Sequence, residues 1–359
     1  TFLESKASAV TEMKASLKVI NGVELVYHLA AHIGVGHVSD RSVVADYLGE
    51  HAADCVLLAK WCKANGAAYV LASTSEVYGR DGHSQEDDWL DVGPSDSARS
   101  AYAVVKLFGE HAMFAYGSEN SCAVRFFNIA GPRQRGLDGG GVLARFCEQA
   151  VNGVPITIYS IDLEEVPTTP HGTGLRSFTD VIDAVYALRV IGEKLALPHP
   201  PGLPRLVNLG GTHNRVDMED LAHRVRKQAA VVGVEAKVCR TRSAGNYDNL
   251  INHMRERSAA DQDFLQAYGV NTVGWYGLDE IIGHVVLDDA VVPGDYRQVE
   301  SRVGEQRLVI DEFLALGVDR FLDHLPIVAG ELHCFGLVRP VVGRQDFAEI
   351  MPCRLVVTE

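Results

Sequence analysis

The sequence predicts an α/β protein, a doubly wound parallel sheet with a smaller α/β lobe. Two observations carry this prediction. Short apolar runs alternate with longer segments of helical periodicity along much of the 359-residue chain, and this alternation is typical of a parallel sheet covered by helices. Residues 68–73 form a run that is apolar almost throughout, as in a strand buried on both faces.

The expected elements follow in chain order. The first 22 residues are interpreted as one helix that leads into a strand. Strands are expected at residues 23–30, 68–73, 121–128, 156–159 and 206–209, and helices at 41–65, 98–116, 142–152, 180–195 and 218–230. Gly66 follows the first of these helices as a stop signal, and Thr179 or Asp180 caps the helix at 180–195. Polar or proline-rich loops are expected at 79–97 and 198–204.

Two side chains of the 98–116 helix carry the first chemical signal. Tyr102 and Lys106 lie four residues apart, so they share one helix face. A lysine beside a tyrosine stabilises the phenolate and lowers its pKa from about 10 toward neutrality. The pair can then take a proton from an alcohol while hydride leaves the same carbon, with the Thr74 hydroxyl on the substrate oxygen. This spacing alone is a weak signal, since chance produces it often.

Further segments lie at residues 27–31, 71–79, 100–106, 125–134 and 172–183. In this order they make the chain resemble the extended short-chain dehydrogenase/reductase family, specifically its NAD-dependent nucleotide-sugar epimerases and dehydratases of the UDP-glucose 4-epimerase type. The resemblance covers residues 23–287. It implies a Rossmann-like NAD domain at 1–152, to which the 180–195 helix and 206–209 strand contribute, and a nucleotide-sugar lobe at 153–287. Residues 288–359 form an extension of unknown role.

The resemblance also implies roles for individual residues. The catalytic set is Thr74, Tyr102, Lys106 and Glu76. The cofactor-binding set is His28, Ala30, Ala31, Ser73, Tyr102, Lys106 and Phe126, and the substrate-binding set is Asn128, Arg176 and Arg255. A guanidinium suits a diphosphate because it donates hydrogen bonds as a fork. No metal site is expected, because the other histidines lack metal-ligand spacing and are interpreted as surface residues.

The implied reaction is transient oxidation at C4 of a nucleotide sugar, with NAD as hydride acceptor. An epimerase returns the hydride to the other face of the 4-keto sugar, a dehydratase eliminates water, and a decarboxylase loses carbon dioxide. Glu76 after Ser75 disfavours a simple 4,6-dehydratase, while residues 131–134 and 172–176 favour an epimerase of UDP-hexoses. UDP-glucuronate decarboxylase and NDP-sugar dehydratase stay open as alternatives.

The opening segment of the family pattern has no counterpart in this sequence. The family opens with a strand, a G-x-x-G-x-x-G turn and a helix that together hold the pyrophosphate. Such a unit needs about 30 residues, and 22 precede the strand at Val23, so we expect a chain that lacks it. Two further alternatives therefore stay open: an inactive family member that serves as a binding or assembly subunit, and a ketoreductase-like enzyme that releases its cofactor.

The composition of the chain limits the kinds of partner that it can bind and the compartment in which we expect it. With 33 Lys and Arg against 47 Asp and Glu, the net charge of −14 argues against binding nucleic acid or a membrane surface. Seven cysteines without a C-x-x-C pair indicate reduced thiols in the cytoplasm. No apolar stretch approaches the 18 residues of a membrane span. We also expect a homodimer, in which the 41–65 and 98–116 helices pack against their copies through Val105, Phe108, Ala112 and Ala115.

Overall fold

The computed structural model describes most of the chain between residues 22 and 291. The described residues are 22–29, 41–79, 83–93, 95, 98–132, 134, 136, 141–160, 174–198, 202–212, 214–242, 258–259, 263–270 and 276–291. The helix expected in the first 22 residues and the extension beyond residue 291 lie outside this set.

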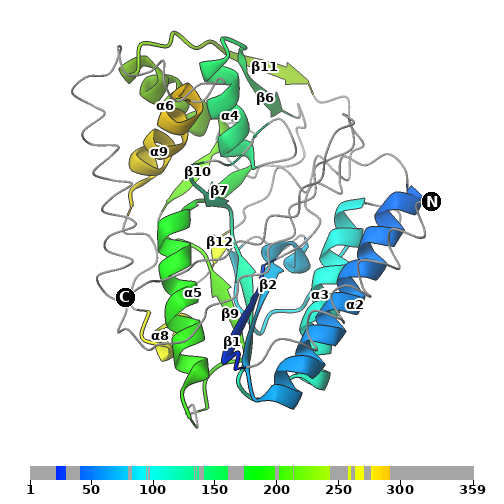
Figure 1. Ribbon diagram of the computed structural model, residues 1–359. Coiled ribbons are helices and arrows are strands. Elements are labelled where there is room, and N and C mark those ends of the chain that lie inside the picture. The colour runs from blue at the N-terminus through cyan, green and yellow to red at the C-terminus, as the bar shows by residue number, and fades with distance from the viewer. Residues whose placement is uncertain are drawn as a thin grey trace, which may run out of the picture.

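A four-stranded parallel sheet forms the centre of the larger part of the molecule (Figure 1). Its strands, in spatial order, are β1 (Leu25–His28), β2 (Ala68–Thr74), β4 (Ser121–Phe126) and β9 (Leu206–Leu209). Every pairing between these strands is parallel. Parallel neighbours need crossover connections, and the chain places α2 (Arg41–Asn65), α3 (Ala98–Tyr116) and α5 (Val181–Ala196) between them.

Alternating side chains of β2 explain why helices cover both faces of the sheet. All seven residues of β2 are buried. Val70 packs into a cluster with Ile191 of α5. Leu71, the next residue, packs on the opposite face in a cluster with Met113 of α3 and residues of α2. Successive residues of a strand point to opposite faces. Accordingly, α5 lies on one side of the sheet and α2 and α3 on the other (Figure 1), which confirms the doubly wound prediction.

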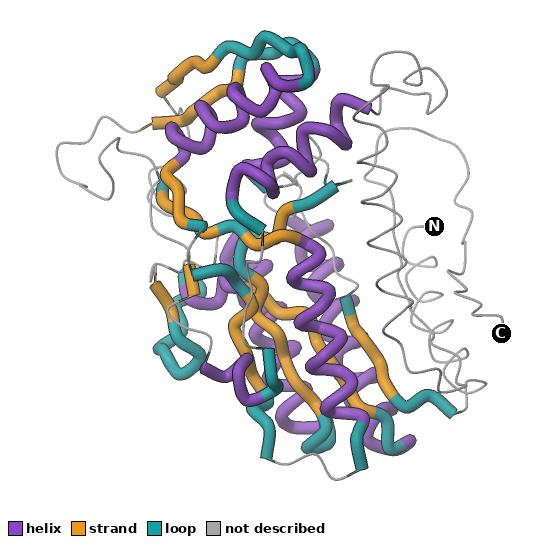
Figure 2. Tube along the Cα trace, turned by 90° about the vertical axis from the view of Figure 1, so that its left-hand side faces the viewer, coloured by secondary structure: helices purple, strands orange, loops and turns teal. Residues whose placement is uncertain are grey.

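The smaller lobe has a hydrophobic cluster of its own. It brings together α4 (Val142–Val151), α6 (Met218–Val231) and α9 (Leu278–Val291) with the parallel pair β6 (Ile156–Ser160) and β11 (Val238–Arg242). Figure 2 shows this group of helices stacked beyond one end of the main sheet. Contrary to the expected boundary at residue 152, α4 belongs to the lobe, because its buried side chains Leu143 and Phe146 pack in the cluster of α6 and α9.

Shorter elements complete the described structure. They are η2 (Ser75–Tyr78), β3 (His83–Ser84), β5 (Ile129–Ala130), β7 (Leu175–Ser177), β8 (Thr179–Asp180), β10 (Arg215–Asp217), β12 (Ser258–Ala259) and α8 (Asp263–Ala267). The strand predicted at 121–128 ends at Phe126 because Asn128 adopts a left-handed φ of 39°, which a β-strand cannot contain. The Asp180 carboxylate accepts from the Ile182 backbone N–H and caps α5 as predicted.

A stop signal at the end of α2 also agrees with the structure. Gly66 follows α2 with a φ of 70°, the left-handed conformation that favours glycine after a helix. No helix in the described ranges is long and apolar enough to cross a bilayer.

Candidate active site

Thr74 and Tyr102 meet at the carboxyl end of β2. Thr74 is the last residue of that strand, and its hydroxyl oxygen accepts a hydrogen bond from the Glu76 backbone N–H at 3.2 Å, which caps η2. The Tyr102 phenol, carried by α3, is hydrogen-bonded to the Thr74 side chain. Ligands of open α/β sheets bind beyond the carboxyl ends of the strands. The two hydroxyls therefore lie together where a substrate of this fold would bind.

Lys106 follows one turn after Tyr102 and is only 3% exposed. Its Nζ atom donates to the carbonyl oxygen of Ala72 in β2 at 2.9 Å and lies 5.9 Å from the centre of the Tyr102 ring. Burial lowers the pKa of Lys106 to about 8, although the Cys55 thiol acts in the opposite direction. An ammonium group is thus fixed against β2 beside the tyrosine.

The pKa of Tyr102 differs from the expectation. Burial, followed by the charge of Glu76, raises the pKa of this phenol to about 12, and the hydrogen bond to Thr74 offsets only part of that rise. The prediction that Lys106 brings the Tyr102 pKa toward neutrality is wrong for this structure. Desolvation penalises the phenolate, while the Lys106 ammonium is engaged by the Ala72 carbonyl.

A buried ion pair, absent from the predicted site, lies behind these groups. The Arg125 guanidinium of β4 donates from Nε and Nη2 to the two Glu110 carboxylate oxygens of α3, at 2.9 and 2.7 Å. Arg125 also donates to the Tyr78 hydroxyl at 2.8 Å. A signal for Glu110 exists in the sequence, since it follows Lys106 at the same four-residue spacing that relates Lys106 to Tyr102.

Residues expected around the cofactor occupy several environments. The Ser73 hydroxyl donates to Glu110 at 2.5 Å, so its side chain supports the ion pair. His28 ends β1, and its Nδ1 atom lies 2.8 Å from the Tyr69 hydroxyl. Burial, and then Lys106, lowers the pKa of His28 to about 3. Phe126 ends β4 and packs partly buried against the cluster under α5. Ala30 and Ala31 lie outside the described residues.

Of the expected substrate-binding residues, Asn128 and Arg176 lie between the sheet and the lobe. Asn128 donates from Nδ2 to the carbonyl oxygen of Ser177 in β7 at 3.0 Å, and its left-handed backbone is a conformation that occurs at functional sites. Arg176 precedes Ser177, is 8% exposed, and donates from Nη1 to the Leu175 carbonyl oxygen at 2.9 Å. The structure thus brings Asn128 next to the strand of Arg176, while Arg255 lies outside the described residues.

Two surface expectations are wrong. His51 of α2 is 5% exposed, because the helix turns this side chain toward the sheet. Val105 and Ala112, expected at a dimer interface, are buried within the chain itself, whereas Phe108 and Ala115 are exposed. The solvent-facing stripe of α3 therefore runs through Val104 rather than Val105.

Comparison with known proteins identifies a family and several relatives to which this chain is similar. The model of the NAD dependent epimerase/dehydratase family matches residues 4–210, more than half of the chain. A UDP-N-acetyl-alpha-D-glucosaminuronate decarboxylase of Bacillus cytotoxicus is 30% identical over 192 residues, which cover 52% of this chain and 56% of that protein. An uncharacterised UDP-glucose epimerase of Bacillus subtilis, YtcB, is 31% identical over 214 residues, which cover 57% and 58%. The chain thus spans little more than half the length of these relatives.

Among solved structures, MoeE5 in complex with UDP-glucuronic acid and NAD superposes with a TM-score of 0.57 at 25% identity. The superposition covers 76% of this chain and 80% of MoeE5. The parallel sheet with helices on both faces is therefore the architecture of the matched structure as well.

Proposed function

Because this chain belongs to the NAD-dependent epimerase/dehydratase family, as its motifs predicted, we propose that it oxidises the C4 hydroxyl of a UDP-sugar transiently and epimerises that carbon. One observation carries the proposal: the Tyr102 phenol is hydrogen-bonded to Thr74 at the carboxyl end of β2, with the Lys106 ammonium beside it. The names of the relatives, a UDP-sugar decarboxylase and a UDP-glucose epimerase, support a UDP-sugar as substrate.

The donor set at this site fits the nicotinamide half of NAD. Lys106 and Tyr102 offer an ammonium and a hydroxyl for the ribose at the strand end. When bound, NAD would accept the C4 hydride, and its positively charged ring would favour the Tyr102 phenolate.

The chain's own residues handle the proton. Tyr102 as phenolate takes the proton of the C4 hydroxyl as the C4–H electron pair leaves, and the C4–O bond becomes a carbonyl. Thr74 donates to that oxygen and holds it in place. On the return step, the phenol gives its proton back to the carbonyl oxygen as hydride reaches the other face of C4. The raised pKa of Tyr102, about 12, suits the second of these steps, in which it acts as the acid.

For the substrate, we place the sugar between the end of the sheet and the lobe. Asn128 lies just past β4 and is held against β7, which supports a position beside the sugar nucleotide. Arg176 on β7 would hold the diphosphate, since a guanidinium can donate two hydrogen bonds to neighbouring phosphate oxygens.

A second candidate function is decarboxylation of a UDP-uronic acid. The names of two relatives favour it, one a UDP-N-acetyl-alpha-D-glucosaminuronate decarboxylase and the other, at 37% identity over 133 residues, a UDP-glucuronic acid decarboxylase of Arabidopsis thaliana. The first step is the same, because a keto group at C4 can accept the electron pair of the C5–C6 bond as an enolate when C6 leaves as carbon dioxide.

We further propose a homodimer in a reducing compartment such as the cytoplasm. Exposed apolar side chains Val104 and Phe108 on α3 support a packing face for a second copy. The five cysteines among the described residues are all free thiols, which supports a reducing environment.

The experiment that tests the function is a product analysis by nuclear magnetic resonance. The purified chain is incubated with NAD and, separately, UDP-glucose or UDP-glucuronate. Inversion at C4 supports the epimerase, and release of carbon dioxide from UDP-glucuronate supports the decarboxylase. Consumption of added NADPH would indicate a reductase, and no conversion by folded chain would favour the binding or assembly subunit.

Two variants complete this test. We expect Tyr102→Phe to lower turnover by at least about 100-fold, since acid–base groups contribute 10²–10⁴-fold. Tyr116→Phe, an exposed tyrosine of the same helix, should turn over like the wild type. Equal rates in both variants would remove Tyr102 from the chemistry.

A further inference from the structure

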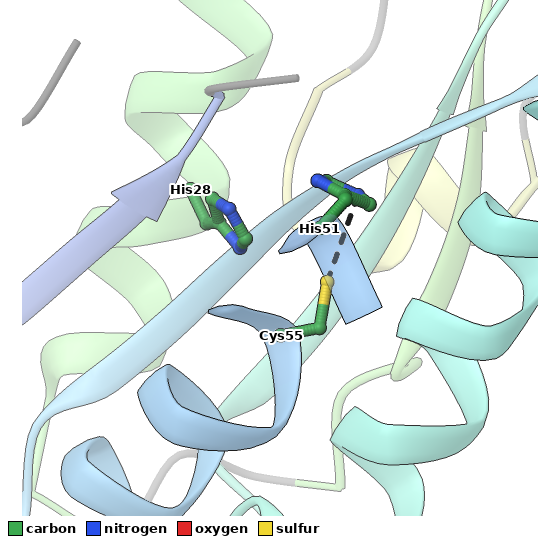
Figure 3. A group of neighbouring side chains, drawn as sticks. All are labelled: His28, His51 and Cys55. Atoms are coloured by element: carbon green, nitrogen blue, oxygen red, sulfur yellow. Dashed lines mark hydrogen bonds between the residues drawn. The ribbon is translucent and has the colours of Figure 1, made fainter. Parts of the chain in front are cut away.

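Three potential metal ligands gather where β1 meets α2. His28, His51 and Cys55 each offer one ligand atom, and these atoms all lie within 4.8 Å of one another. Figure 3 shows His28 at the end of β1 beside His51 and Cys55 of α2. All three side chains are buried, with Cys55 fully so. The mechanism above uses none of their side chains.

The distances suit a small tetrahedral site. His51 Nε2 and Cys55 Sγ are 3.6 Å apart. Zinc binds histidine nitrogen at about 2.0–2.1 Å and thiolate sulfur at about 2.3 Å, so a tetrahedral ion separates such a pair by about that distance. The ligand atom of His28 lies within 4.8 Å of both of these atoms.

The local sequence explains why the pair forms. His51 and Cys55 are four residues apart on α2, and side chains at this spacing lie on one helix face. Two ligands at i and i+4 of a helix are a recurrent arrangement in zinc proteins. The third ligand comes from a strand end that the sheet fixes, since His28 pairs with Leu71 of β2.

A hydrogen bond already orients the His28 ring. Its Nδ1 atom lies 2.8 Å from the Tyr69 hydroxyl, which leaves the other ring nitrogen for a metal. Ligating histidines commonly use one ring nitrogen for such an outer hydrogen bond.

From this geometry we propose that His28, His51 and Cys55 form a zinc site that joins the end of β1 to α2, with a small exogenous ligand in the fourth position. Imidazole nitrogen and thiolate sulfur are ligands that zinc accepts readily. On binding, the Cys55 S–H proton passes to solvent as the sulfur–zinc bond forms. Burial raises the pKa of the Cys55 thiol to about 12, the Lys106 ammonium acts in the opposite direction and the Asp54 carboxylate adds to the rise, so the bond to zinc has to supply the driving force for loss of this proton.

The test uses the full chain, stripped with a chelator and titrated with Co²⁺, a coloured stand-in for zinc. We expect one cobalt ion per chain, with a thiolate-to-cobalt charge-transfer band and the visible absorption of tetrahedral cobalt. Both absorption signals should disappear when Zn²⁺ displaces the cobalt. Cys55→Ser should abolish the charge-transfer band. Cys62→Ser removes another buried thiol of the same helix and should keep it. His51→Gln should weaken cobalt binding at least about 10-fold, whereas His111→Gln, an exposed residue of α3, should not.

A measurement on the unaltered chain covers the case in which Cys55→Ser fails to fold. X-ray absorption at the zinc edge should find one sulfur at about 2.3 Å and two histidine nitrogens at about 2.0–2.1 Å. A zinc shell without sulfur, no cobalt thiolate band in the wild type, or a band that survives in folded Cys55→Ser overturns the proposal. None of these readouts depends on turnover of a sugar nucleotide, so the zinc site and the proposed function stand or fall separately.

Discussion

The Lys106 ammonium of α3 donates a hydrogen bond to the Ala72 carbonyl oxygen of β2 at 2.9 Å. This contact ties the helix that carries Tyr102 to the strand that ends in Thr74. The position of the phenol over the strand end is therefore set by a buried charge as well as by packing, and both the stability and the chemistry of the site should respond to Lys106.

The first prediction concerns Lys106 and pH. Burial lowers its pKa from 10.5 to about 8, so between about pH 8 and 10.5 the unfolded chain binds more protons than the folded chain. Lys106 therefore makes the free energy of unfolding rise with pH across that window and adds no slope below it. Relative to Lys106→Met, the wild type should gain about 3 kcal/mol of stability from pH 8 to 10.5.

Urea unfolding of both proteins at several pH values checks this prediction. The difference between the two free energies of unfolding removes groups that titrate in both chains. A difference that stays constant from pH 8 to 10.5 would mean that Lys106 has an ordinary pKa.

A second prediction concerns the ion pair behind the site. Glu110→Gln leaves the buried Arg125 guanidinium without its counter-charge, and we expect a loss of about 3–5 kcal/mol in the free energy of unfolding. The matched control is Glu119→Gln, because Glu119 is exposed and pairs with Arg205 at 3.5 Å. Exposed pairs of this kind contribute up to about 1 kcal/mol. Equal losses in the two variants, measured by denaturant unfolding, would count against a supporting role for Glu110.

The third prediction concerns Arg176 and the diphosphate. Arg176→Ala should weaken UDP-sugar binding by about 1.5–3 kcal/mol, the range for hydrogen bonds to charged groups, with less effect on NAD. Arg215→Ala is the control, since Arg215 is exposed on β10, the strand that pairs with β7. Calorimetric titration compares them, and unchanged UDP-sugar affinity in Arg176→Ala assigns that arginine a structural role.

Much of the fold could be predicted from local patterns. The bounds of α2, α3 and β9 agree with the expected residues, because helical periodicity and stop signals such as Gly66 act over short distances. The pairs β5–β8 and β7–β10 contain strands of two or three residues. They form only because segments far apart in the chain meet, which periodicity in a window does not reveal.

The candidate site likewise combines residues that the sequence could predict with features that depend on packing. Tyr102 and Thr74 were predictable because each lies within a recognisable segment, and the structure brings their side chains together. Burial of His51 and the pairing of Glu110 with Arg125 depend on how α2 and α3 pack on the sheet. The raised pKa of Tyr102 depends on desolvation, which spacing on a helix cannot supply.

The central claim is that Tyr102 takes a proton as C4 loses hydride, and that the same hydrogen returns to the sugar. Its most direct test follows UDP-glucose and UDP-glucuronate deuterated at C4, each incubated with the chain and NAD in ordinary water, with products weighed by mass spectrometry. The account predicts product that keeps its deuterium, and no product from Tyr102→Phe. Product that has exchanged the label for solvent hydrogen, or Tyr102→Phe that retains more than about a tenth of the wild-type rate, would contradict it.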